Sequence, residues 1–169
     1  KFSIISLSKF DIIINCSTNN NYVNNKYQSK NDYDLLIAKK IKNLYPKLVI
    51  MSTRKIYKPK FNISEKDQVK PKCNYSKNKL KSEKLVSKIL NNRLLILRVA
   101  NIIGLPKKNK RKIHKTFSDI FFDEIKKGFI YNNKNNYKDF ISIKKFCEIV
   151  FNLIKYNTYG IYNVSLGKK

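Results

Sequence analysis

Residues 47–52 read KLVIMS, an apolar run with the length of a buried strand rather than of a helix. Uninterrupted apolar strands of this kind are typical of parallel sheets that are covered on both faces. The runs FDIIIN at residues 10–15 and LLILRV at residues 94–99 have the same character. The sequence therefore predicts three buried strands in one parallel sheet.

Amphipathic helices are predicted between these strands. Residues 32–45 carry apolar side chains at helical spacing, with Asn31 or Asp32 available as the N-cap and Pro46 just beyond the end. Residues 75–91 place their apolar side chains on one face and Lys and Glu elsewhere. Because alternating strands and helices imply right-handed crossovers, we expect an α/β fold, a parallel sheet with helices on both faces.

The pattern changes after Gly104. A helix is predicted at residues 116–127, closed by Gly128, and another at residues 143–156, with Ser142 as its N-cap. The remaining segments are short strands, at residues 160–164 and optionally 129–131, and loops, at residues 17–25, 58–74 and 132–138.

The net charge of +26 raises the alternative of a basic nucleic-acid-binding module. The excess is nearly all Lys, is spread along the chain, and accompanies heavy use of Asn, Ile and Tyr, a bias that an A/T-rich genome would produce. The dense cluster KKNKRK, residues 107–112, follows Gly104-Leu105-Pro106 as a solvated loop would. We therefore expect no nucleic-acid partner, and keep the nucleic-acid-binding module as the alternative.

The cysteines and the single histidine do not suggest a metal site. Cys16, Cys73 and Cys147 are widely separated, form no Cys-x-x-Cys pair, and His114 is the only histidine. We expect the three thiols to be small buried apolar residues, and no metal. No run of about 18 apolar residues exists, so we expect no membrane association and a reducing, cytoplasmic location.

Tyr75 and Lys79 lie four residues apart, so both side chains fall on one face of the predicted helix. A nearby cation favours the phenolate and lowers the pKa of a tyrosine from about 10 towards neutrality. The spacing alone is weak, because Tyr22 and Lys26 share it. Thr53 supplies the context: it follows KLVIMS at the carboxyl edge of a parallel strand, where open α/β sheets bind ligands.

In order along the chain, six segments resemble the extended short-chain dehydrogenase/reductase family. This family includes NAD-dependent epimerases and dehydratases of nucleotide sugars and dTDP-4-dehydrorhamnose reductases. The segments are FDIIINCS (10–17), VIMSTRKIY (49–57), NYSKNKLKSE (74–83), LILRVANIIG (95–104), KDFISI (138–143) and GIYNVSLG (160–167).

The resemblance implies a role for each matching residue. Tyr75 would be the general acid/base, Lys79 would hold the nicotinamide ribose and lower the pKa of Tyr75, and the Thr53 hydroxyl would complete the catalytic set. The residues implied to touch NAD or NADP are Cys16, Ser17, Tyr75, Lys79 and Val99. The residues implied to touch the nucleotide sugar are Thr53, Asn101 and Lys138.

Each of these residues also has a purely structural interpretation. Thr53 could merely finish a strand, Asn101 could cap a turn, and Asp139 could form a local Asx-turn. Tyr57 is expected to pack in the core rather than to act in catalysis. Glu83 is expected to be a solvated helix residue.

The family begins with a Gly-rich turn that holds the cofactor pyrophosphate, and the four glycines of this chain cannot form it. We therefore expect an N-terminally truncated, Rossmann-like domain whose first βαβ unit is missing, with lost cofactor binding as the alternative. Residues 1–104 would be the latter part of the NAD(P)-binding domain. Residues 105–169 would be a partial substrate-binding region, and the fragment alone would be inactive.

The resemblance also narrows the reaction. The 4,6-dehydratases of the family follow their catalytic Thr with Asp-Glu, whereas Arg54-Lys55 follows Thr53 here, so dehydration is not expected. The implied activity is NAD(P)-dependent epimerisation or reduction of a nucleotide sugar, in surface polysaccharide or deoxysugar synthesis, by a full-length homodimer. A catalytically silent relative that binds a dinucleotide is a further alternative.

Overall fold

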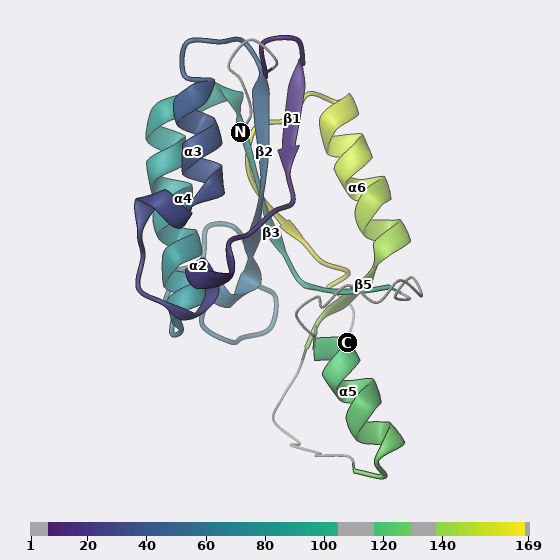
Figure 1. Ribbon diagram of the computed structural model, residues 1–169. Helices are drawn as coiled ribbons and strands as arrows, with labels where there is room; N and C mark the ends of the chain where they lie inside the picture. Colours follow the sequence, from purple (N-terminus) through teal and green to yellow (C-terminus); the bar gives the residue numbers. More distant parts are fainter. Residues whose placement is uncertain (1–6, 105–116, 130–137, 168–169) are drawn as a thin grey trace.

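The computed structural model describes residues 7–104, 117–129 and 138–167, and a four-stranded parallel sheet forms its centre (Figure 1). The strand order is β1-β2-β3-β6. The strands are β1 (Ile12–Asn15), β2 (Lys47–Thr53), β3 (Leu94–Val99) and β6 (Gly160–Val164). The parallel strands predicted from the apolar runs are thus confirmed.

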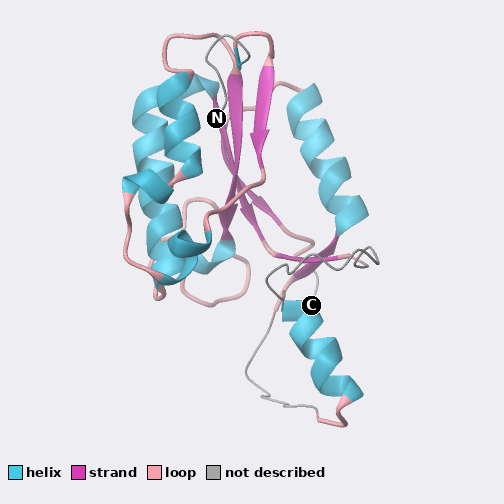
Figure 2. Ribbon diagram, viewed as in Figure 1, coloured by secondary structure: helices cyan, strands magenta, loops and turns pink. Residues whose placement is uncertain are grey.

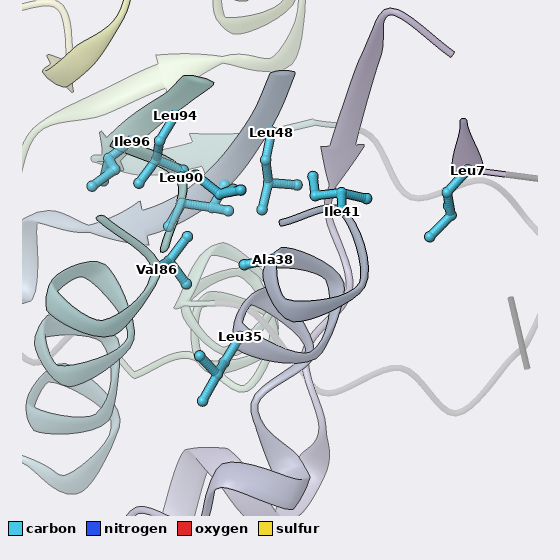
Figure 3. Packing of buried hydrophobic residues seen from close by; sticks show 10 residues of the cluster. Leu7, Leu35, Ala38, Ile41, Leu48, Val86, Leu90, Leu94 and Ile96 are labelled. Carbon is cyan, nitrogen blue, oxygen red and sulfur yellow. The ribbon is translucent and has the colours of Figure 1, made fainter. Parts of the chain in front are cut away.

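Helices cover both faces of this sheet, as predicted (Figure 1). On one face lie α3 (Tyr33–Lys40) and α4 (Asn74–Leu90), and on the other lies α6 (Ile143–Lys155). In the first layer, Ala38 of α3 and Val86 of α4 pack with Leu48 and Ile96 of the sheet (Figure 3). Buried residues of β2, β3 and β6 form a second cluster with Val150 of α6.

Local hydrogen bonds explain where α3 and α6 begin. The Asp32 carboxylate accepts a hydrogen bond from the backbone N–H of Leu35, and the Ser142 hydroxyl accepts one from that of Lys145. Both caps were predicted. The helix α3 ends at Lys40 rather than at residue 45, because the chain turns there and its carbonyl groups face a guanidinium. Arg93 donates to the backbone carbonyls of Ile41, Lys42, Leu44 and Pro46.

Several short elements were not predicted. A helix, α2 (Asn20–Asn24), lies within the expected loop 17–25, because the Asn19 side chain caps it. Beyond β3, the strands β4 (Asn101–Ile103) and β5 (Phe140–Ser142) pair in parallel and form a separate two-stranded sheet. Three-residue 3₁₀-helices are η1 (Ser29–Asn31), η2 (Arg54–Ile56) and η3 (Asn91–Arg93).

The C-terminal part of the chain contributes to the main sheet, because β6 pairs with β3. The helix α5 (Phe117–Lys126) lies below the sheet in the view of Figure 2 and is followed by Gly128 with a positive φ of 82°. Phe129 is not in a strand. The KKNKRK cluster, residues 130 and 131, and residues 132–137 lie outside the described residues. The division at residue 104 into two regions stays a prediction.

No helix in the described part of the chain combines the length and the apolar character that crossing a membrane requires.

The central position of β3 leads to a prediction about the free energy of unfolding. Ile96 and Ile161 are neighbours in the β3–β6 register, but Ile96 is 1% exposed and Ile161 is 37% exposed. We expect Ile96→Ala to lower the free energy of unfolding by about 3 kcal/mol, since it leaves a cavity in the core. The matched control Ile161→Ala should cost less than about 1.5 kcal/mol. Urea unfolding of the chain measures both, and equal losses would contradict this account of the core.

Candidate active site

The predicted catalytic residues Thr53 and Tyr75 line one cavity of about 630 Å³ at the carboxyl ends of β2 and β3. The N-terminal turn of α4 brings Tyr75 to this cavity. Cys16, Val99 and Asn101 line it as well. Five of the eight predicted site residues therefore share one cavity, whereas Ser17, Lys79 and Lys138 are not among its lining residues.

Thr53 has two structural roles that are compatible with each other. It is the last residue of β2, and its Oγ1 accepts a hydrogen bond from the backbone N–H of Lys55 at 3.2 Å, which caps η2. The side chain is buried but still borders the cavity. Finishing a strand and presenting a hydroxyl to a ligand are thus both possible for Thr53.

Burial raises the pKa of Tyr75 above its usual value, although the charge of Lys79 opposes this shift. Asp34 and Cys73 add to the upward shift. The expectation that Lys79 would bring the pKa of Tyr75 below its usual value is therefore wrong for this structure, because desolvation outweighs the cation. Tyr75 is a neutral phenol, able to donate a proton or to accept a hydrogen bond.

Lys79 is buried and faces away from the cavity lining. Its Nζ donates to Oδ2 of Asp34 on α3 at 3.1 Å, and the two side chains are 5% and 3% exposed. The Asn15 amide donates to the other carboxylate oxygen of Asp34. Burial raises the pKa of Asp34, and Lys79 and Asn15 counteract this. Sequence reasoning missed Asp34, since an acidic residue in a first helical turn also has a simple explanation in the helix dipole.

Glu83 is not the solvated helix residue that the sequence suggested. It is buried and forms a two-pronged ion pair with Arg98 of β3, with Nε to Oε1 at 3.2 Å and Nη2 to Oε2 at 2.7 Å. The Ser52 hydroxyl also donates to Glu83. Tyr57 is buried, as expected, and its hydroxyl accepts from Arg98 and donates to Oδ1 of Asn163 at 3.0 Å.

A second cavity, of about 250 Å³, has a different set of lining residues. Lys138 lines this cavity together with Arg54, Tyr57 and Asn163. Burial lowers the pKa of Lys138, and the charges of Arg54 and Lys55 lower it further. The structure therefore separates Lys138 from the cavity of Thr53 and Tyr75.

The remaining predicted residues have clear local partners. The Ser17 hydroxyl donates to Oδ1 of Asn15 at 2.7 Å. The backbone N–H and the side-chain amide of Asn101 both donate to the Asp139 carbonyl, which joins β4 to β5. The Asp139 carboxylate accepts from the backbone N–H groups of Leu166 and Gly167, so it ties distant segments together rather than forming a local Asx-turn.

The three cysteines are exposed, which corrects the expectation that they are buried. Cys16 directly follows β1, Cys73 is the N-cap residue of α4, and Cys147 is on α6; none of them belongs to the two apolar clusters. Partial burial raises the pKa of Cys16, and the neighbouring Cys147 and Asp34 raise it further. At Cys73 desolvation also acts upward, but hydrogen bonds with Ser76 and the charge of Lys55 outweigh it and lower the pKa. In the described residues, no three His, Cys, Asp or Glu side chains are grouped as metal ligands.

Solved structures of nucleotide-sugar enzymes share this fold. The UDP-N-acetylglucosamine 4-epimerase of Methanobrevibacter ruminantium, solved with UDP-N-acetylmuramic acid, matches 98% of this chain with a TM-score of 0.77 and 20% identity. The Bordetella bronchiseptica enzyme WbmG, solved with NAD, matches 98% with a TM-score of 0.73 and 18% identity. A dTDP-4-dehydrorhamnose reductase of Yersinia enterocolitica matches 95% with a TM-score of 0.71 and 20% identity.

The chain spans 58%, 54% and 58% of the lengths of these three structures. No protein-family model and no curated protein matches the chain. At these identities the likeness establishes the fold, a Rossmann-like parallel sheet, as the sequence resemblance implied.

The buried Asp34–Lys79 pair leads to a stability prediction. Removing one partner leaves a charge buried without its counter-ion, so Asp34→Asn should lower the free energy of unfolding by about 3 kcal/mol. The double variant with Lys79→Met should lose at least about 1 kcal/mol less than the sum of the single variants. Urea unfolding measures each variant.

The exposed pair Lys145–Glu148 provides the control. Glu148→Gln should change the free energy of unfolding by less than about 0.5 kcal/mol. Strict additivity of Asp34→Asn and Lys79→Met would show that the buried pair is not coupled.

The opposite pKa shifts of Cys73 and Cys16 predict different reactivity. Because the thiolate is the nucleophile, iodoacetamide at pH 7.5 should alkylate Cys73 at least about twofold faster than Cys16. Peptide mapping by mass spectrometry during a time course measures both rates. The variant Lys55→Gln should slow the reaction of Cys73, and faster modification of Cys16 would contradict the assigned environments.

Proposed function

We propose that this chain carries the catalytic residues of an NAD(P)-dependent nucleotide-sugar epimerase or reductase of the extended short-chain dehydrogenase/reductase family. One observation carries the proposal: Thr53 and Tyr75, from separate elements, border one cavity at the carboxyl ends of parallel strands. This edge is where open α/β sheets bind ligands. The shared fold of the nucleotide-sugar enzymes supports the same assignment.

The residues of the cavity fit the nicotinamide end of a dinucleotide. Cys16, Val99 and Ala100 offer small or apolar surface, while Thr53 and Tyr75 offer hydroxyls. The Gly-rich turn that would hold the pyrophosphate is not among these 169 residues. When bound, the cofactor supplies the hydride transfer that no side chain can perform.

The side chains would move and hold the proton that accompanies this chemistry. Tyr75, a neutral phenol, would donate its proton to a sugar carbonyl or, as phenolate, remove one from a hydroxyl. Thr53 would donate a hydrogen bond to the same sugar oxygen. Lys79 lies one turn along α4 from Tyr75, and its positive charge stabilises the phenolate even though Asp34 shares that charge.

Epimerisation or reduction is favoured over dehydration. Removal of water needs an acid and a base beside the catalytic Thr, and here the cations Arg54 and Lys55 take those positions. Lys138, in the neighbouring cavity with Arg54, would contact the diphosphate of the nucleotide sugar. Asn101, which lines the cavity of Thr53 and Tyr75, would contact the part of the nucleotide sugar between the reacting sugar and the diphosphate. A homodimer in the cytoplasm is part of the same proposal.

Substitution of the proposed acid/base tests the function. In the complete product of the gene that encodes this chain, Tyr75→Phe should lower kcat by roughly a hundredfold or more, since general acid/base catalysis is lost. The affinity for the nucleotide sugar should change by less than about threefold. Assays with NAD(P) and a panel of UDP- and dTDP-sugars measure both.

Tyr45→Phe is the matched control, because Tyr45 is exposed and lies outside both cavities. It should leave kcat unchanged. Full turnover by Tyr75→Phe would remove Tyr75 from the mechanism, and binding without turnover by the parent protein would favour the silent relative.

A further inference from the structure

Two adjacent cations follow the proposed catalytic hydroxyl, and the fold directs them into different cavities. Thr53 caps η2, whose first residues are Arg54 and Lys55. Lys55 lines the cavity of Thr53 and Tyr75, whereas Arg54 lines the neighbouring one. Lys55 therefore supplies the positive charge at the cavity of Thr53 and Tyr75.

Lys55 is the one charged side chain among the described residues that line the cavity of Thr53 and Tyr75. The other lining groups are hydroxyls, amides, a thiol and apolar side chains, and none of these neutralises an ammonium group. The ion pairs of the described residues do not include Lys55. The Lys55 residue is exposed as well as lining the cavity, so its ammonium group is free to pair with an anionic ligand bound there.

Neighbouring groups locate this charge at the cavity. The backbone N–H of Lys55 is 3.2 Å from Oγ1 of Thr53. The charge of Lys55 acts on Cys73, at the start of α4, and also on Lys138 across η2. Lys55 thus borders the same cavity as Tyr75.

The two cavities would hold different parts of a nucleotide sugar. Under the proposed function, Thr53 and Tyr75 contact the reacting sugar, while Lys138 in the other cavity contacts the diphosphate. The cofactor pyrophosphate is assigned to the Gly-rich turn, so the anion that pairs with Lys55 belongs to the sugar itself. One ammonium group balances one negative charge, as a carboxylate carries, whereas a phosphate ester carries about −1.5 to −2.

We propose that the substrate is the nucleotide derivative of an acidic sugar, whose carboxylate pairs with Lys55 beside Thr53. The proposal rests on the proposed function and adds the substrate class to it. Arg54 lines the neighbouring cavity with Lys138, so it is not assigned to this carboxylate.

Binding to the complete product of the gene that encodes this chain tests the proposal without any need for turnover. UDP-glucose and UDP-glucuronic acid differ only at C6 of the sugar, which is a hydroxymethyl group in the first and a carboxylate in the second, so the ratio of their dissociation constants reports on the carboxylate. Titration calorimetry should give a roughly fivefold preference for UDP-glucuronic acid, the size of one partly exposed ion pair. Lys55→Gln should reduce this ratio to about one.

Lys66→Gln is the control, because it removes one positive charge from an exposed lysine that lines neither cavity. It should retain the preference. An equal loss in both variants would show attraction by overall charge, and no preference in the parent chain would show a neutral sugar site; each overturns the proposal. If neither UDP-sugar nor dTDP-glucose binds, nucleotide-sugar binding fails, and with it the proposed function.

Discussion

The candidate site depends on how α4 packs against the sheet. Two ion pairs, one helical turn apart, fix this packing: Lys79 binds Asp34 of α3, and Glu83 binds Arg98 of β3. The buried side chains of α4 are therefore polar up to Glu83, whereas Val86 and Leu90 further along the helix join the apolar cluster. Buried ion pairs add little net stability, but they tolerate few alternative arrangements. Tyr75, at the start of this helix, owes its position relative to Thr53 to these contacts.

Much of the fold could be predicted from sequence because it depends on local patterns. The apolar runs of β2 and β3 and the caps Asp32 and Ser142 each act within a few residues, and the structure confirms them. Glu83 and Asp34 were misjudged or missed because their partners are distant in sequence. No local pattern reveals that Arg98 will face Glu83, 15 residues away, or that Lys79 will reach Asp34, 45 residues away.

The candidate site shows the same division. Residue order at strand and helix ends predicted that Thr53, Tyr75 and Val99 lie together, because parallel strands bring their carboxyl ends to one edge. The direction of a side chain could not be predicted in this way. Lys79 faces α3 rather than the cavity, and Lys138 borders a different cavity, since both depend on tertiary packing. The direction of the pKa shift of Tyr75 likewise depends on burial, because desolvation opposes the charge of Lys79.

The strand β1 ends the order of the described sheet, with β2 as its one neighbour in that order, and this has a consequence for the behaviour of the chain in solution. Its apolar residues are not fully covered: Ile14 is 45% exposed, and Phe10, just before the strand, is 55% exposed. The unpaired backbone groups at the edge of a sheet can pair with a strand of another molecule. The net charge of +26 keeps molecules apart through mutual repulsion, and dissolved salt shortens the range of that repulsion. A higher ionic strength would therefore weaken the charge repulsion that keeps the β1 edges of separate chains apart.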